Sequence, residues 1–334
     1  MLVDIMNEQC KTDQVQLLII NNFYNSELLL KIDSRVRIYC LDRVPGSLDI
    51  INIIRLNAIV YRARPDIMHF HDHNGIRTTL LRGHAKTLLT AHGLQCPTKH
   101  LKSYDKLISI SKAVQDDLSG RGYQSLLIYN GVNFSKIVAK KSFHFQDKFR
   151  LVQVSRLHHE IKGQDVLLKA VHNLVYEKNI KNLQLDFIGE GPSMNYLLGL
   201  TKQLSLEGYV NFVGLKDRNF ICQNLAKYDL LVQPSLNEGF GLTIIEAMGA
   251  RIPAIVSNIK GPMEVINNGQ HGFHFNTGDP NSCANTIANV LERLPNLYSD
   301  DFIDSAYNYA VSNFSLTTTC FAYLECYKQS ISQN

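Results

Sequence analysis

The segment from Gln233 to Ala250 carries two glutamates, Glu238 and Glu246, separated by seven residues. A strand is expected to end just before it, followed by a loop with Gly239 and Gly241 and a helix that begins near Leu242. Glycines at a helix start let backbone N–H groups approach an anion, and the helix dipole adds partial positive charge there. The segment therefore predicts a cradle for a diphosphate.

The two carboxylates suit a different part of the same ligand. Glu246 lies about one turn into the expected helix, and helical side chains tilt toward the N-terminus, so it can reach hydroxyls above the loop. Glu238 lies in the loop itself. A carboxylate is a good bidentate acceptor for paired sugar hydroxyls. Together the residues predict a site for a sugar joined to a diphosphate.

Two basic residues follow the strand expected at 150–155, in Val154-Ser-Arg156-Leu and Lys162-Gly163. Arg156 offers a forked pair of donors and Lys162 a compact point charge, and both suit phosphate oxygens. Taken alone, such residues are more often solvated surface groups.

Histidines follow two expected strands of the first half. His69, His71, Asp72 and His73 lie within five residues, and His92 follows the next strand. Positions 69, 71 and 73 would share one strand face, so a metal site is one interpretation. A lone histidine such as His92 is otherwise most often a packed or capping residue.

These segments resemble the signature of the retaining, GT-B-type glycosyltransferases known as group 1 or family 4. The two glutamates in their Gly, Phe and Ala-Met context carry the resemblance. Supporting matches cover most of the chain, namely Arg156 with Lys162, Gly189-Glu-Gly-Pro192, Phe212-Val-Gly214, the two histidine segments, and Tyr129-Asn130-Gly-Val-Asn133.

The resemblance implies a role for each matching position. The expected catalytic residues are His92, Arg156, Lys162 and Glu238, of which Arg156 and Lys162 hold the donor diphosphate. The expected donor-binding residues are Gly189, Gly191, Val213, Glu238, Gly239, Phe240, Gly241, Leu242 and Glu246. His71 and Asn130 are expected on the acceptor side.

The resemblance also implies the reaction, a transfer from a nucleotide-sugar with retention at the anomeric carbon. A UDP-sugar is favoured as the family's commonest donor. Positive side chains and a helix end would stabilise the departing diphosphate, so no metal or other cofactor is expected. Because no second carboxylate is evident on the opposite face, attack from the front face is favoured over the two-carboxylate route of glycosidases.

Short apolar strands alternate with amphipathic helices, which is typical of parallel sheets covered by helices on both faces. Strands are expected at 15–20, 36–39, 67–71, 87–90, 106–110 and 125–129, and again at 150–155, 183–188, 210–213, 230–234, 252–256 and 272–275. The predicted fold is α/β, with two Rossmann-like doubly wound domains facing a cleft. The expected parts are an acceptor domain at 1–145, a nucleotide-sugar domain at 146–308, and a helix at 309–334 that crosses back.

Composition and charge bear on where in the cell this chemistry would take place. The 334 residues have a net charge of +4, too mild to indicate nucleic acid. Residues 1–150 hold 21 Lys and Arg against 13 Asp and Glu. This asymmetry suggests that one half meets an anionic surface, and a chance scatter of solvated lysines is the equally open alternative. With the resemblance, it suggests a lipid-linked acceptor at an anionic membrane, as in lipopolysaccharide, O-antigen or capsule assembly. Scattered cysteines, no signal peptide and no apolar run of membrane-spanning length favour a cytoplasmic protein, peripheral to the membrane at most.

Two rival hypotheses come from other classes. An NAD-dependent oxidoreductase or epimerase would need a Gly-x-Gly-x-x-Gly turn after a strand, and the sequence has none. A catalytically degenerate transferase that serves as a partner subunit stays open.

The start of the chain departs from the family pattern, which opens with a strand and a Gly-Gly loop. Here Leu2, Val3, Ile5 and Met6 predict a helix, and the first glycine is Gly46. We therefore expect a strand and loop of roughly 15–20 residues upstream of Met1. Without them, an apolar slot is expected beside the strand at 15–20.

Overall fold

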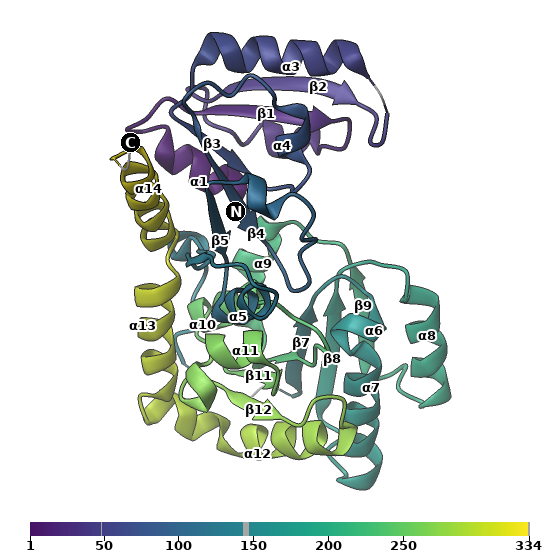
Figure 1. Cartoon of the computed structure of the whole chain (residues 1–334). Helices are drawn as coiled ribbons and strands as arrows, with labels where there is room; N and C mark the ends of the chain where they lie inside the picture. Colours follow the sequence, from purple (N-terminus) through teal and green to yellow (C-terminus); the bar gives the residue numbers. More distant parts are fainter. Residues whose placement is uncertain (48, 143–146, 333–334) are drawn as a thin grey trace. The chain divides into compact units, whose positions relative to one another are not determined.

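The computed structural model describes residues 1–47, 49–142 and 147–332, and the chain divides into two compact units. Unit 1 comprises Met1–Gly131 with Leu316–Asn334, and unit 2 comprises Val132–Ser315. Both are α/β units with parallel strands, as the sequence predicts (Figure 1). The boundary expected near residue 145 falls within the segment 143–146, which is outside the described residues, and the chain passes from unit 1 to unit 2 after Gly131.

Unit 2 contains one six-stranded parallel sheet with the order β12-β11-β10-β7-β8-β9. The strands are β7 (Phe149–Val154), β8 (Leu183–Ile188), β9 (Val210–Gly214), β10 (Leu230–Gln233), β11 (Ala254–Ser257) and β12 (Phe273–Phe275). Leu151, Val152 and Leu231 are fully buried, because central strands of a parallel sheet are covered on both faces. All six lie where the sequence predicts strands.

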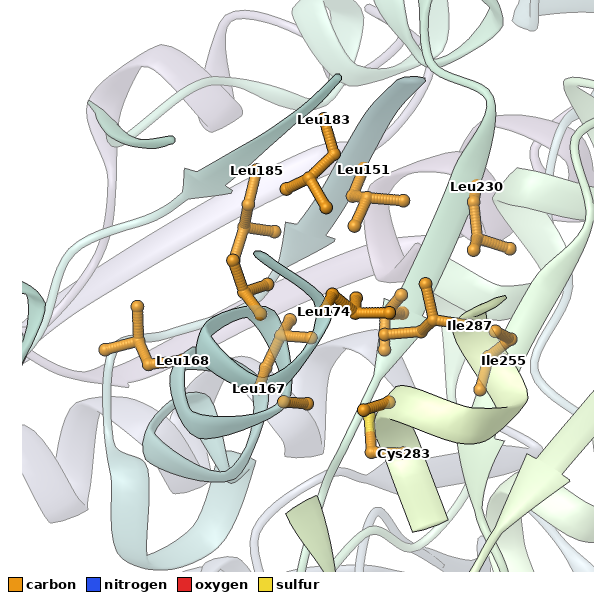
Figure 2. Packing of buried hydrophobic residues seen from close by; sticks show 14 of the residues in the cluster. Leu151, Leu167, Leu168, Leu174, Leu183, Leu185, Leu230, Ile255, Cys283 and Ile287 are labelled. Atoms are coloured by element: carbon orange, nitrogen blue, oxygen red, sulfur yellow. The ribbon is translucent and has the colours of Figure 1, made fainter. Parts of the chain in front are cut away.

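Helices α7 (Gln164–His172) and α12 (Pro280–Ser299) contact each other and pack on this sheet. Figure 2 shows Leu151, Leu185 and Leu230 of the strands facing Leu167 of α7 and Ile287 of α12. The helix expected at 164–178 continues as far as Glu177, with its last five residues, Asn173–Glu177, in a π-helical turn. The other helices of unit 2 are α6 (His159–Lys162), α8 (Met194–Gln203), α9 (Arg218–Asn224), α10 (Leu242–Gly249), α11 (Lys260–Val265) and α13 (Phe302–Phe314).

Unit 1 divides its strands between two parallel sheets. β1 (Gln16–Asn21) pairs with β2 (Arg37–Arg43), and β3 (Ile67–Phe70), β4 (Lys86–Ala91), β5 (Lys106–Ser109) and β6 (Leu126–Leu127) pair in sequence order. Within the described ranges, β1 and β3 each keep one edge without a strand partner. Every residue of β1 and β3 is only half-buried, whereas β4 is almost wholly buried.

Helices join the two sheets of unit 1. Helix α1 (Leu2–Gln9) packs Met6 against the side of β1 and Ile5 against β4. Helix α3 (Ile50–Ala63) packs Leu56 and Val60 among side chains of β1, β2 and β3. Helices α2 (Ser26–Leu29), α4 (Gly75–Thr78) and α5 (Lys112–Gly120) complete the first part of the unit.

The last helix of the chain, α14 (Leu316–Ser332), belongs to unit 1. Its Leu316 and Tyr323 enter the same apolar cluster as Leu88 of β4 and Ile108 of β5, and the Thr319 hydroxyl donates to the Tyr129 carbonyl. Across the described part of the chain, no helix combines the length and apolarity needed to cross a bilayer.

We expect Leu167→Ala to lower the free energy of unfolding of unit 2 by about 2–5 kcal/mol, because Leu167 is fully buried and the substitution leaves a cavity. Chemical denaturation measures this loss. Leu198→Ala in α8 is the matched control, since that side chain is about half exposed. Equal losses in the two variants would contradict the packing described.

Candidate functional site

The loops after β7, β8, β9 and β10 meet at the carboxyl edge of the unit 2 sheet, where ligands bind in open α/β sheets. Their backbones are hydrogen bonded to one another. The Leu157 N–H donates to the Glu190 carbonyl at 3.0 Å, and the Gly189 N–H donates to the Gly214 carbonyl at 3.0 Å. The expected donor-binding residues Gly189 and Gly191 therefore belong to one connected group of turns, and Val213 lies next to it near the end of β9.

Glycine is required where these turns touch. Gly189 has φ +142°, and a Cβ there would collide with the Ser155 carbonyl oxygen. A Cβ on Gly191 would collide with the Leu157 carbonyl oxygen. The absence of side chains lets the turn after β8 lie directly against the backbone around Arg156.

A second close contact brings the loops after β7 and β10 together. Gly163 has φ +63° and leaves no room for a Cβ beside the Pro234 carbonyl, and the Ile161 carbonyl accepts from the Leu236 N–H at 2.8 Å. This contact places Lys162 Nζ 2.5 Å from Glu238 Oε2, and both side chains are largely buried. Two of the expected catalytic residues thus form an ion pair.

Arg156 is held by its backbone, while its side chain is exposed at the sheet edge. The Gln164 amide donates to the Arg156 carbonyl and to Ser155 Oγ, each at 3.0 Å, and Gln153 donates to the Lys162 carbonyl at 3.0 Å. Both glutamines are essentially fully buried. They fix the main chain that carries the two basic residues.

Helix α10 begins beside these groups, with Gly241 at its N-cap and φ +126°. Gly261 of α11 faces the backbone of Glu238, Gly239 and Phe240, where a Cβ would approach within 2.8 Å of the Phe240 nitrogen. The expected segment from Glu238 to Leu242 is therefore packed from behind, and its front lies at the carboxyl edge beside Lys162.

Glu246 lies one turn into α10 and is buried, with 6% of its surface exposed. Arg218, near the start of α9, reaches it with Nε 3.3 Å from Oε1. Burial raises the pKa of Glu246, and the Arg218 charge acts in the opposite direction. Glu246 is thus a carboxylate at the site whose charge is balanced by a cation.

Unit 1 brings together two of the other expected residues. His71, directly after β3, has Nδ1 2.8 Å from Nε2 of His92, directly after β4, and the two rings are stacked. Adjacent parallel strands explain this pairing, since their carboxyl ends share one edge. Burial, and then the proximity of His92, lowers the pKa of His71 to about 3.

His69 lies beneath this pair. One ring nitrogen is 2.6 Å from the Tyr327 hydroxyl and the other 2.7 Å from Thr90 Oγ1. Over the described residues, no group of three or more His, Cys, Asp or Glu side chains is arranged to hold a metal ion. Asn130, which follows β6, is buried, and its side-chain oxygen has no hydrogen-bond partner in the described structure.

Sequence reasoning missed four residues of the unit 2 site, namely Gln153, Gln164, Gln233 and Arg218. The three glutamines are buried at strand ends or a helix start, and Gln233 donates to Ser235 Oγ at 2.9 Å. A buried polar residue at the end of an apolar strand is a usable signal, because it must find hydrogen bonds there. Arg218 had no such signal, since an arginine near a helix start is ordinary.

We expect thermal stability to fall between pH 7 and pH 5 because of His69 and His71. Burial is the main cause that lowers the pKa of both in the folded state, whereas the unfolded chain binds protons near the ordinary value of 6.5. The unfolded state therefore holds more protons below pH 6.5, and stability is lost as the pH falls. Calorimetric melting temperatures against pH measure the effect.

The His71→Asn variant should show a shallower decline than the wild type over this range. A half-exposed side chain that does not titrate supplies the control, and Leu198→Ala should leave the slope unchanged. Parallel slopes for wild type and His71→Asn would contradict the burial argument.

Comparison with known proteins identifies the family of the chain. Residues 135–308 match the family model described as glycosyl transferases group 1, and residues 9–115 match the model described as glycosyl transferase 4-like. An uncharacterized glycosyltransferase of Methanocaldococcus jannaschii is 28% identical over 210 residues, which are 58% of this chain and 53% of that protein. The chain thus spans about half the length of this relative.

Two solved structures share the fold. A glycosyltransferase from Rickettsia africae superposes with a TM-score of 0.84 at 20% identity, over 99% of this chain and 94% of that one. Anabaena HepE in complex with UDP-glucose superposes with a TM-score of 0.77 at 18% identity, over 100% and 95%. The fold is therefore that of GT-B glycosyltransferases. Because the group 1 model alone matches more than half of its residues, the chain belongs to the group 1 glycosyltransferases.

Proposed function

We propose that the protein transfers a sugar, with retention, from a nucleotide-sugar to a saccharide or lipid-linked acceptor, and that the donor is a UDP-sugar. The arrangement at the carboxyl edge of unit 2 carries the proposal. Arg156, the Lys162–Glu238 pair and the glycine-rich start of α10 meet there, with Glu246 one turn into the helix. The complex of HepE with UDP-glucose supports the choice of base.

The donor diphosphate binds between Arg156, Lys162 and the N-terminus of α10. When the C1–O bond breaks, negative charge grows on the departing diphosphate, and these positive groups stabilise it. Lys162 reaches the diphosphate while still paired with Glu238. The Glu238 carboxylate accepts hydrogen bonds from the sugar hydroxyls, and Glu246 accepts them from other hydroxyls of the donor.

The acceptor belongs to unit 1, with His71 and His92 at its edge and Asn130 as a further polar contact. The acceptor oxygen bonds to C1 on the face that the diphosphate leaves, so the configuration is retained. Its proton passes to the leaving phosphate oxygen. Because the pKa of His71 is lowered, the histidine pair stays neutral at pH 7 and acts through hydrogen bonds.

The basic first half of the chain supports a lipid-linked saccharide as acceptor. Such acceptors lie at the anionic inner face of the cytoplasmic membrane, where basic residues are attracted. Assembly of a surface polysaccharide is the kind of process that supplies them.

We expect Glu246→Ala to raise KM for the donor roughly 10- to 100-fold with a smaller effect on kcat. The lost hydrogen bonds to a charged group are worth about 1.5–3 kcal/mol and form equally in ground and transition states. Arg156→Ala should instead lower kcat by about 100-fold or more, because its charge acts when the bond breaks. Release of free UDP measures both.

Glu246→Gln is the matched variant, since it keeps the size of the side chain and loses the charge that faces Arg218. It should show a rise in KM smaller than that of Glu246→Ala. An unchanged KM for Glu246→Ala would contradict its assignment to donor binding. No UDP release by the wild type with any of a panel of UDP-, GDP- and ADP-sugars would favour the degenerate partner-subunit alternative.

We expect the transfer to continue in excess EDTA, because side chains and a helix end stabilise the diphosphate. UDP release with and without EDTA, at equal ionic strength, measures this. A complete loss that Mg²⁺ restores would refute metal independence and direct attention to the segment from His69 to His73.

A further inference from the structure

Helix α3 of unit 1 exposes a row of large apolar side chains. Ile50, Ile51, Ile54 and Tyr61 are 66%, 73%, 63% and 62% exposed. On the opposite side of the helix, Leu56 and Val60 pack on the strands as core residues. A helix that is apolar on both its core face and its outer face needs a second explanation, since monomers rarely expose contiguous apolar patches.

A second segment extends this outer face. Leu80 and Leu81, after α4, are 67% and 53% exposed, and they line one shallow hollow of about 470 Å³ with Ile54, Ala58 and Tyr61. The outer face is thus formed by two segments that are distant along the chain. We call these seven residues, Ile50, Ile51, Ile54, Ala58, Tyr61, Leu80 and Leu81, the α3 face.

A buried amide holds the two segments in register. Asn57, only 6% exposed, accepts from the Leu80 N–H at 2.6 Å and from the Leu81 N–H at 2.8 Å, and donates to the Ile53 and Thr78 carbonyls at 2.8 Å each. The two leucines are therefore fixed in an exposed position by the fold. Their exposure is not the result of a loose loop.

Basic residues outnumber acidic ones along the two segments that form the α3 face. Residues 49–66 contain Arg55, Arg62 and Arg64 against Asp49 and Asp66, and residues 73–86 contain Arg77, Arg82 and Lys86 and no acidic residue. Arg55 and Arg62 are exposed on α3 itself, seven residues apart and hence on one side of the helix. An apolar face flanked by arginines has the pattern of a helix that lies in the interface of an anionic bilayer.

We propose that the α3 face is a docking surface for an anionic lipid bilayer, with the isoleucines and leucines inserted among the acyl chains and the arginines at the headgroups. The proposal rests on the proposed function, because docking on a bilayer would bring the protein to a lipid-linked acceptor. It also places bilayer contact on the unit that carries His71 and His92. A second copy of the chain is the less favoured occupant, because two such faces would bring like charges together.

The test is co-sedimentation of the full chain with vesicles. Phosphatidylcholine vesicles containing phosphatidylglycerol should bind the protein, and vesicles of phosphatidylcholine alone should bind it at least tenfold more weakly. Added salt should weaken binding, since exposed charges are screened over about 8–10 Å at ordinary ionic strength. Equal binding to both vesicles, or none to either, would overturn the proposal.

Two double variants locate the surface. Ile51→Ser with Ile54→Ser should lower binding tenfold or more, and Arg55→Gln with Arg62→Gln should lower it by a similar factor and reduce its dependence on salt. The matched control is Phe321→Ser with Leu198→Ser, which removes apolar side chains of similar exposure elsewhere, 65% and 47%, and should bind like the wild type. Unchanged binding of both test variants would contradict the assignment.

Two further measurements separate the possible failures. Light scattering should show the same mass for the wild type and for the variant Ile51→Ser with Ile54→Ser. A wild type that is dimeric, together with a variant that is monomeric, would assign the α3 face to a second copy of the chain. UDP binding, measured without vesicles by thermal shift, reports on the proposed function alone. Retained UDP binding with no vesicle binding would overturn only the docking surface.

Discussion

The close packing of backbone at the carboxyl edge of the unit 2 sheet is the constraint on which the site depends. Gly163, Gly189, Gly191 and Gly261 each touch a neighbouring loop where a Cβ does not fit. Because the loops are in direct contact, residues from different strands reach the same place. The Lys162–Glu238 pair and the glycine-rich start of α10 follow from these contacts.

Buried polar groups then hold this edge in place. Gln153 and Gln164 hydrogen bond to the main chain that carries Lys162 and Arg156, and Arg218 balances the buried charge of Glu246. Unit 1 has a similar arrangement, in which the His69 ring lies between the hydroxyls of Tyr327 and Thr90, next to the His71–His92 pair. In both units, a group to which the proposed function gives a chemical role is supported by a buried group that holds it in position.

The sequence was sufficient to predict the twelve strands of the described residues, the α/β class and the family, because glycines, strand ends and the two glutamates have local signatures. The Lys162–Glu238 contact could not be predicted, since it depends on how the loops after β7 and β10 meet around Gly163. The Glu246–Arg218 pair joins α10 and α9, and nothing local in the sequence links them. The division of unit 1 into two sheets is likewise a matter of pairing between strands, which hydrophobic pattern alone does not settle.

The α3 face shows another limit of prediction from sequence, namely which apolar residues of a helix are buried. Apolar residues lie on both faces of α3, and only the packing separates Leu56, which is buried, from Ile54, which is exposed. The role of Asn57 depends on Leu80 and Leu81, more than twenty residues later. The excess of Lys and Arg in residues 1–150 suggested an anionic partner, and the structure adds where basic and apolar side chains lie together.

Calorimetric titration of UDP into the metal-free protein tests the central claim, that the loop contacts of unit 2 form a nucleotide site. Gly189→Ala introduces a Cβ against the Ser155 carbonyl, while Gly199→Ala in α8 has open space around it and serves as the control. The account predicts UDP binding by the wild type and by Gly199→Ala, and loss of binding by a still-folded Gly189→Ala. Absence of binding by the wild type, or equal affinity in Gly189→Ala, would contradict it.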